Sequence, residues 1–208
     1  MEYKVDNKKI NIKNLRFLGS GCEGEVFKWK NYALKIKYND TIGLSYDDCH
    51  YMRNIATSNI LMPKGIFYSN NRYSGYTTRY ISHISNFNLI DVPKDYLINN
   101  ILIPIEEDLR VLSNRKVTLS DLTLSNTIKN DSLYLIDPGS YVVLKDLSSE
   151  SINSINLEEL RDYLNTLINK ELKKYKLNYE IGECDSFSYY IKNEISNNLS
   201  IKEYILKK

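Results

Sequence analysis

The sequence predicts an α+β fold in which an antiparallel sheet comes first along the chain and helices follow it. Three short segments between Asn14 and Tyr38 are rich in Val, Phe, Trp, Tyr and Ile, with a glycine cluster and Lys30-Asn31 between them. This pattern indicates a three-stranded meander. Beyond Tyr96, apolar residues recur mainly at the helical period. Because 208 residues suffice for one large domain or two small lobes with a core between them, we expect a single domain over 1–208.

A helix and a second strand pair complete the first part of the chain. Leu44–Ala56 carries apolar residues near the helical period, with acids early and Arg53 late, as a helix dipole favours. Strands at Ile66–Tyr68 and Tyr73–Ile81 are expected to form a hairpin around the turn Asn70-Asn71. The part up to about residue 82 is therefore expected to be a five-stranded antiparallel sheet with one helix.

Helices are expected to dominate from about residue 83 to 208. Tyr96–Leu112 is apolar and helical in pattern, and Pro104 divides it or begins a new helix. A Ser/Asn-rich loop is expected over Ser148–Asn156, followed by a helix from Leu157 whose leucines share one face. Two short helices in Tyr189–Leu206 are expected to end the chain.

Charge and cysteine content limit the class of protein. The 28 Lys and Arg against 26 Asp and Glu leave a net charge of +2, which gives no reason to expect a nucleic acid or a membrane as partner. Three cysteines without a CxxC spacing disfavour a disulfide framework or a zinc site and fit a reducing compartment. The charged N-terminus and the lack of an apolar run of about 18 residues predict neither a signal peptide nor a membrane anchor. We therefore expect a cytoplasmic (intracellular) protein.

A glycine motif lies between the first two predicted strands. Gly19, Gly21, Gly24 and Val26 form the pattern GxGxxGxV. Glycines at these positions allow a hairpin backbone to lie close to the phosphates of a nucleotide, and Val26 can cover one face of the base. A dinucleotide-binding protein would place a helix after the last glycine, whereas the residues here, EVFKWK, favour a strand.

Three further motifs carry polar groups. The strand segment YALKIK contains Ala33 and Lys35, Asp121 and Asn126 stand five apart in DLTLSN, and Asp137 ends the next apolar run. Phosphoryl transfer needs a cation for the phosphates, oxygen ligands for Mg²⁺ and a carboxylate near the incoming hydroxyl. The lysine, the amide and the two aspartates can supply these groups.

Taken together, these motifs resemble those of the eukaryotic-like protein kinase superfamily over roughly Leu15–Gly139, in the family's order. The resemblance implies a compact two-lobed protein-kinase-like fold, with an abbreviated, mostly helical large lobe and ATP in the cleft between the lobes. The sequence departs from the family where Leu119, Ser120 and Pro138 replace His, Arg and Phe. It also has no APE motif and no room for the full helical subdomain that holds peptide substrates.

The resemblance assigns roles to these positions. Asp121 is expected to be catalytic, Lys35 to contact the phosphates, and Asn126 and Asp137 to bind Mg²⁺. The implied ATP-binding set is Leu18, Gly19, Gly21, Gly24, Val26, Ala33, Lys35 and Ile128, in which the apolar side chains enclose the adenine.

Asp48 matches the glutamate that forms an ion pair with the strand lysine in the family, although its side chain is one methylene shorter. If Asp48 does not reach the lysine, the alternatives are that Asp47 or Glu25 substitutes for it or that the pair is not made.

We therefore expect an ATP- and Mg²⁺-dependent Ser/Thr protein kinase that transfers the γ-phosphate to a hydroxyl acceptor. The short second part and the missing motifs leave a kinase of a small molecule, such as an antibiotic, as an alternative. Asp48 and Pro138 leave a third one open, a pseudokinase that serves as a nucleotide-binding regulatory module.

Overall fold

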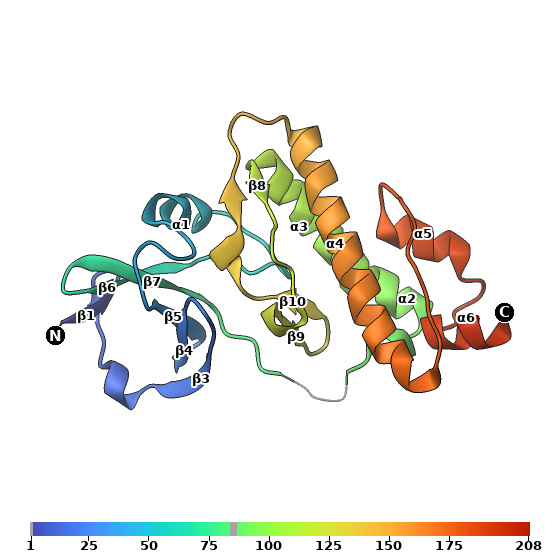
Figure 1. The fold of residues 1–208 in the computed structure, drawn as a ribbon, viewed down its shortest axis with the longest axis horizontal. Coiled ribbons are helices and arrows are strands. Elements are labelled where there is room, and N and C mark those ends of the chain that lie inside the picture. The colour runs from blue at the N-terminus through green and yellow to red at the C-terminus, as the bar shows by residue number, and fades with distance from the viewer. Residues whose placement is uncertain (1, 84–86) are drawn as a thin grey trace.

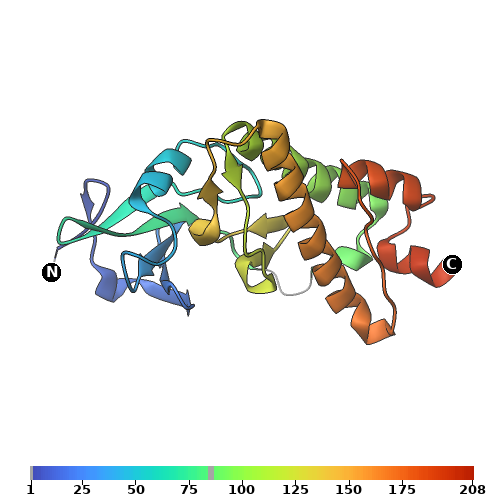
Figure 2. The ribbon, with the colours of Figure 1, turned by 45° about the horizontal axis from the view of Figure 1, so that its top comes forward.

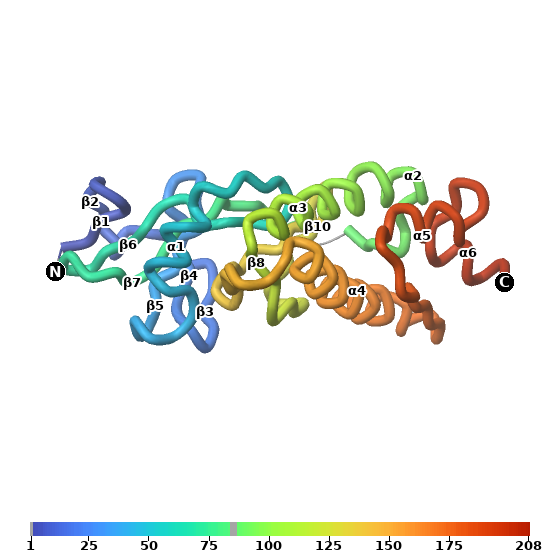
Figure 3. Tube along the Cα trace, turned by 90° about the horizontal axis from the view of Figure 1, so that it is seen from above, coloured from blue at the N-terminus to red at the C-terminus, as the bar shows by residue number. Residues whose placement is uncertain are grey.

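The computed structural model describes residues 2–83 and 87–208. Figure 1 shows a sheet and helix α1 near the N-terminus, and helices α2 to α6 toward the C-terminus, with short strand pairs between them. Seen from above in Figure 3, α3 and α4 lie beyond the sheet, and α5 and α6 lie at the far end. The predicted α+β class, with a largely antiparallel sheet and several helices, is confirmed.

The sheet has seven strands, each antiparallel to its neighbours, in the order β2-β1-β6-β7-β5-β4-β3. The strands are β1 (Tyr3–Val5), β2 (Lys8–Lys9), β3 (Arg16–Ser20), β4 (Gly24–Trp29), β5 (Tyr32–Lys37), β6 (Gly65–Ser69) and β7 (Arg72–Arg79). The predicted number of five was wrong, because the N-terminal hairpin adds two strands at the edge. Val5 is buried against Leu34 and Phe67, and Tyr3 stacks on Phe67, so apolar residues in a charged segment anchor that hairpin.

Helix α1 (Tyr46–Met52) is shorter than the predicted Leu44–Ala56. The side chain of Ser45 accepts the backbone N–H of Asp48, which caps the N-terminus of the helix. The carbonyl of Leu44 accepts instead from Lys37 Nζ and the Tyr73 hydroxyl, both at 2.9 Å. These side-chain contacts hold the residue before the cap outside the helix.

The predicted break at Pro104 is a local change of helix type. Helix α2 (Lys94–Leu97) continues through a π-helical segment (Ile98–Leu102) into α3 (Ile103–Asn114). Proline has no N–H to donate to the carbonyl four residues earlier, and here that carbonyl, of Asn100, accepts the Ser132 hydroxyl at 2.7 Å. The wider π turn accommodates the proline without ending the helix.

Two short antiparallel strand pairs lie between the sheet and the helices (Figure 1). β9 (Thr127–Lys129) pairs with β10 (Leu133–Leu135), and β8 (Val117–Thr118) pairs with β11 (Val142–Val143). The segment before β6 joins the first pair, since Leu61 N donates to Leu135 O at 2.8 Å. The loops that carry the predicted polar motifs start and end at these strands.

The segment predicted as a loop, Ser148–Asn156, is the first part of helix α4 (Ser149–Leu172). The Ser148 side chain accepts the N–H of Ser151 and caps the helix. Asn156 is fully buried, accepts from Leu119 N at 2.7 Å and donates to Val117 O at 3.0 Å. Asn156 is therefore polar because it binds the backbone at β8. The polar residues of this segment do not mark a loop.

The C-terminal helices α5 (Phe187–Glu194) and α6 (Ile201–Lys207) confirm the predicted final pair. Figure 2 shows α4 running between the strand pairs and these two helices. One apolar core spans most of the chain and includes Met52 of α1, Tyr76 of β7, Leu109 of α3, Leu160 of α4 and Ile201 of α6. Ile66 and Tyr76 of the sheet thus share a core with the helices, whereas Val5, Leu34 and Phe67 form a separate, smaller cluster. Over residues 2–83 and 87–208, no helix has the length and hydropathy to cross a membrane.

Candidate active site

A cleft of about 640 Å³ lies between strands β3 to β5 of the sheet and the β9–β10 hairpin. Every residue assigned a site role from the sequence lines it, with the exception of Asp48. These residues are Leu18, Gly19, Gly21, Gly24, Val26, Ala33, Lys35, Asp121, Asn126, Ile128 and Asp137.

The glycine-rich turn joins β3 to β4 over this cleft. Gly21 N donates to Gly24 O at 3.0 Å and closes the turn. A Cβ at Gly24 would lie 2.1 Å from Ile36 O, so the sheet itself requires glycine there. Gly19 and Gly21 have no atom within 4 Å of the position of a Cβ. Packing therefore leaves open space beside these two glycines, which line the cleft.

Part of the lining of the cleft is apolar. Leu18, Val26 and Ala33 come from three adjacent strands of the sheet, and Ile128 comes from β9. All four side chains are partly exposed. They form a slot with an apolar lining on both sides.

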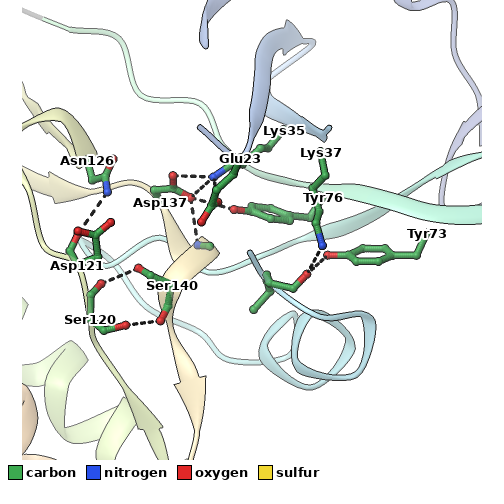
Figure 4. Close-up of polar contacts among 12 residues, drawn as sticks. Glu23, Lys35, Lys37, Tyr73, Tyr76, Ser120, Asp121, Asn126, Asp137 and Ser140 are labelled. Atoms are coloured by element: carbon green, nitrogen blue, oxygen red, sulfur yellow. Dashed lines mark hydrogen bonds and ion pairs between the residues drawn. The ribbon is translucent and has the colours of Figure 1, made fainter. Parts of the chain in front are cut away.

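Lys35 lies at the centre of a network of charged groups (Figure 4). Its side-chain nitrogen Nζ lies 2.7 and 2.9 Å from the two carboxylate oxygens of Asp137 and 2.5 Å from Oε2 of Glu23. Asp137 Oδ1 also accepts the Tyr76 hydroxyl at 2.9 Å and the N–H of Gly139 at 3.0 Å. A β5 lysine, a β7 tyrosine and the loop after β10 therefore meet at one carboxylate.

The electrostatics of this network favour a charged lysine. Burial would lower the pKa of Lys35, which is only 8% exposed, but Asp137 and then Glu23 outweigh burial and raise the pKa above its usual value. Burial first, and then Asp137, raises the pKa of Tyr76 well above its ordinary range. Lys35 therefore remains a cation and Tyr76 a neutral donor at physiological pH.

The prediction that Asp48 pairs with Lys35 was wrong. The carboxylate of Asp48 accepts the Ser45 hydroxyl at 2.8 Å, because Asp48 lies in the first turn of α1 beside the helix cap. In the described part of the chain, the ion pairs of Lys35 go to Glu23 and Asp137. Neither Asp47 nor Glu25 substitutes for Asp48, and Glu23 was missed although it lies inside the glycine motif.

The loop that carries Asp121 and Asn126 is held by hydrogen bonds between its backbone and two side chains. Asn126 Nδ2 donates to Asp121 O at 3.3 Å, and Leu122 N donates to the carboxylate of Glu159 on α4 at 3.1 Å. Asp121 itself is exposed and has φ of 55°, in the left-handed region that aspartate tolerates better than most residues. Its carboxylate therefore lies at the surface of the cleft on a fixed loop.

Reciprocal hydrogen bonds join this loop to the segment after Asp137. The Ser120 hydroxyl donates to Ser140 O, and the Ser140 hydroxyl donates to Ser120 O at 2.6 Å (Figure 4). The loop that carries Asp121 and the loop that carries Asp137 are thus linked directly.

The side-chain oxygens of Asn126 and Asp137 suit a hard divalent cation that takes its remaining ligands from a bound phosphate or from water. Within the described ranges, no three His, Cys, Asp or Glu residues gather as a metal cluster. Asn126 and Asp137 both line the cleft, and the hydrogen bond from Asn126 Nδ2 leaves its amide oxygen available. One carboxylate, one amide oxygen and the oxygens of a bound phosphate form a common ligand set for Mg²⁺.

No family model matches the sequence, and no curated protein matches it.

Proposed function

We propose that this protein is an ATP- and Mg²⁺-dependent phosphotransferase of the protein-kinase-like type, most simply a Ser/Thr protein kinase. The observation that carries the proposal is the convergence of the glycine-rich turn, Lys35, Asp121, Asn126 and Asp137 on one cleft. These residues come from four separate segments of the chain. Chance motifs would have no reason to meet in space.

The cleft fits a nucleotide in size and in chemistry. Its volume of about 640 Å³ lies within the range of about 300–1,000 Å³ found for small-molecule sites. The apolar slot suits the adenine ring, the open space beside Gly19 and Gly21 suits the phosphates, and Lys35 supplies the positive charge.

Bound Mg²⁺ would neutralise the phosphate charge, and the carboxylate of Asp137 with the amide oxygen of Asn126 would hold it. Asp137 is already oriented by Tyr76 and Gly139. Asp121 lies at the surface of the cleft, where its carboxylate can accept the proton of an incoming hydroxyl. Lys35 would stabilise the charge on the phosphates.

One feature favours a kinase of small molecules as the second candidate. After Ser140 the chain passes through β11 and reaches Ser148, the cap of α4. Protein kinases use a longer segment and a helical subdomain at this point to hold a peptide. An acceptor that needs little contact beyond the reacting hydroxyl fits the short connection.

The test is transfer from radiolabelled ATP with Mg²⁺ to casein and to a panel of small hydroxyl compounds. Lys35→Ala and Asp137→Ala should each lower the rate at least about a hundredfold while circular dichroism stays unchanged. Lys13→Ala and Asp146→Ala, at exposed positions outside the cleft, serve as controls. Full activity in both cleft variants would contradict the proposal. ATP binding without transfer would point to a regulatory nucleotide-binding module.

A further inference from the structure

The second acid on Lys35 comes from the glycine-rich turn itself. Glu23 reaches Lys35 Nζ at 2.5 Å, the shorter of the two ion pairs of this lysine. Figure 4 shows its side chain pointing from the turn toward Lys35 and Asp137. The carboxylate therefore lies between the sheet and the loop that holds Asp137.

Two glycines from distant segments make room for this carboxylate. A Cβ at Gly43, in the loop before α1, would lie 2.8 Å from Glu23 Oε2, and a Cβ at Gly139 would lie 2.4 Å from the same atom. A Cβ at either position would push the end of the flexible Glu23 side chain away from the place where it meets Lys35. The packing of three chain segments thus fits a carboxylate at this position.

The backbone of Glu23 is also fixed. Tyr38 N donates to Glu23 O at 3.0 Å, and the next residue, Gly24, pairs with Lys37 across β4 and β5. Glu23 therefore extends the strand pairing by one residue, although it belongs to the turn in sequence. Its side chain starts from an ordered point beside the lysine strand.

The contacts of Lys35 distinguish its two acidic partners. A lysine ammonium group has three N–H donors, and here one contact goes to Glu23 and two go to Asp137. Asp137 is also held by Tyr76 and Gly139. If the carboxylate of Asp137 turns toward a cation, the contact between Lys35 and Glu23 does not depend on that change.

We propose that Glu23 is the positioning residue for Lys35, holding the ammonium group toward the phosphate end of the cleft in place of an acid on helix α1. The inference rests on the proposed function and deepens it. It makes the orientation of Lys35 independent of helix α1, since Asp48 bonds to Ser45. Movement of α1 would then not switch the enzyme on and off.

The first experiment measures the chemical reactivity of Lys35 and does not require the protein to transfer phosphate. Trace acetylation with acetic anhydride at pH 8, followed by mass spectrometry of the Lys35 peptide, should show faster labelling of Lys35 in Glu23→Gln. Loss of the Glu23 carboxylate removes a contact that holds Lys35 Nζ and helps to raise its pKa, so the amine is freer to react and labelling should be several times faster. Asp48→Asn, the matched control, should differ from wild type by less than about twofold. Equal labelling in wild type and Glu23→Gln, or faster labelling in Asp48→Asn, would overturn the proposal.

The second experiment tests whether Glu23 acts through Lys35. Glu23→Gln should lower kcat about tenfold, with KM for ATP changed by less than about threefold, and Glu23→Asp should restore part of the loss. In the Lys35→Ala background, Glu23→Gln should cause no further loss. An equal loss in both backgrounds, or unfolding of both Glu23 variants in circular dichroism, would overturn the role. If wild type transfers no phosphate, the proposed function fails, and the labelling experiment still decides the role of Glu23.

Discussion

The hydroxyl of Tyr76 donates a hydrogen bond to Oδ1 of Asp137 at 2.9 Å, which connects strand β7 to the loop after β10. Tyr76 is only 2% exposed, and its raised pKa keeps the phenol protonated. A neutral donor at this position orients the carboxylate without competing for a cation. The sheet therefore positions the proposed metal ligand independently of Lys35.

Tyr76→Phe should weaken the response to Mg²⁺. Without the hydroxyl, Asp137 loses one of the contacts that orient it, and we expect the Mg²⁺ concentration for half-maximal transfer to rise several-fold. The free energy of unfolding should fall by about 1.5–3 kcal/mol, the range for a hydrogen bond to a charged group. Magnesium titration and urea denaturation measure the two effects.

Tyr73→Phe is the matched control for this variant, because the Tyr73 hydroxyl donates to Leu44 O and does not contact the acidic loops. It should lose stability but keep the wild-type response to Mg²⁺. Equal Mg²⁺ responses in the two variants would show that the Tyr76 hydroxyl does not orient Asp137 for a cation.

Much of the candidate site could be predicted from the sequence because its motifs are local. The spacing of Asp121 and Asn126, and the position of Lys35 in a strand, place side chains that the cleft then brings together. The role of Glu23 could not be predicted in this way. It depends on Gly43 and Gly139, which approach the turn only after the chain has folded.

In the fold, too, local patterns could be predicted from the sequence, whereas contacts between distant segments could not. The spacing of apolar residues along the sequence predicted the β3–β5 meander, the β6–β7 hairpin and the C-terminal helices. It failed at Ser148–Asn156, where the buried Asn156 binds the backbone of β8. It also failed for β1, a strand of only three residues in a charged segment, which forms by pairing with β6. Both errors arise where tertiary contacts outweigh local preference.

Asp121→Asn should lose most of its turnover and keep its affinity for ATP. The carboxylate is exposed and interacts with the acceptor hydroxyl in the proposed reaction, so its charge matters for transfer more than for binding. Calorimetry with ATP and a transfer assay separate the two effects, and Asp131→Asn, also exposed, is the control. Loss of ATP affinity would instead place Asp121 among the metal ligands.

Asp108→Ala should be the most destabilising of these changes. The buried Asp108 carboxylate on α3 accepts the backbone N–H groups of Ser58, Asn59 and Ile60 at 2.8, 2.6 and 2.8 Å. Removing it leaves three donors without their acceptor, at a cost of about 3 kcal/mol or more. Urea denaturation measures the loss, with the exposed Glu107→Ala on the same helix as control. A difference below about 1 kcal/mol between the two variants would contradict this anchoring role.

Cys49 should make stability depend on alkaline pH. Burial raises the pKa of its thiol from 9.0 to about 11, so the folded protein keeps the proton at pH values where the unfolded chain releases it. The contribution is fully present below pH 9 and is lost as pH rises through about 11. Denaturation of wild type and Cys49→Ala between pH 8 and 11 should show a steeper fall in wild type. Parallel curves would contradict a buried, protonated thiol.

Cys22 offers a probe of the cleft that does not require turnover. It is exposed and lines the cleft in the glycine-rich turn, whereas Cys49 is buried and Cys184 is half-buried. Iodoacetamide at pH 7.5 should therefore modify Cys22 first, since a reactive cysteine must be accessible and form its thiolate. Bound ATP with Mg²⁺ should slow this modification, because the phosphates would lie under the turn. Mass spectrometry of the three cysteine peptides gives the rates, and Lys35→Ala should lose the protection. Equal rates for Cys22 with and without nucleotide would contradict binding at this turn.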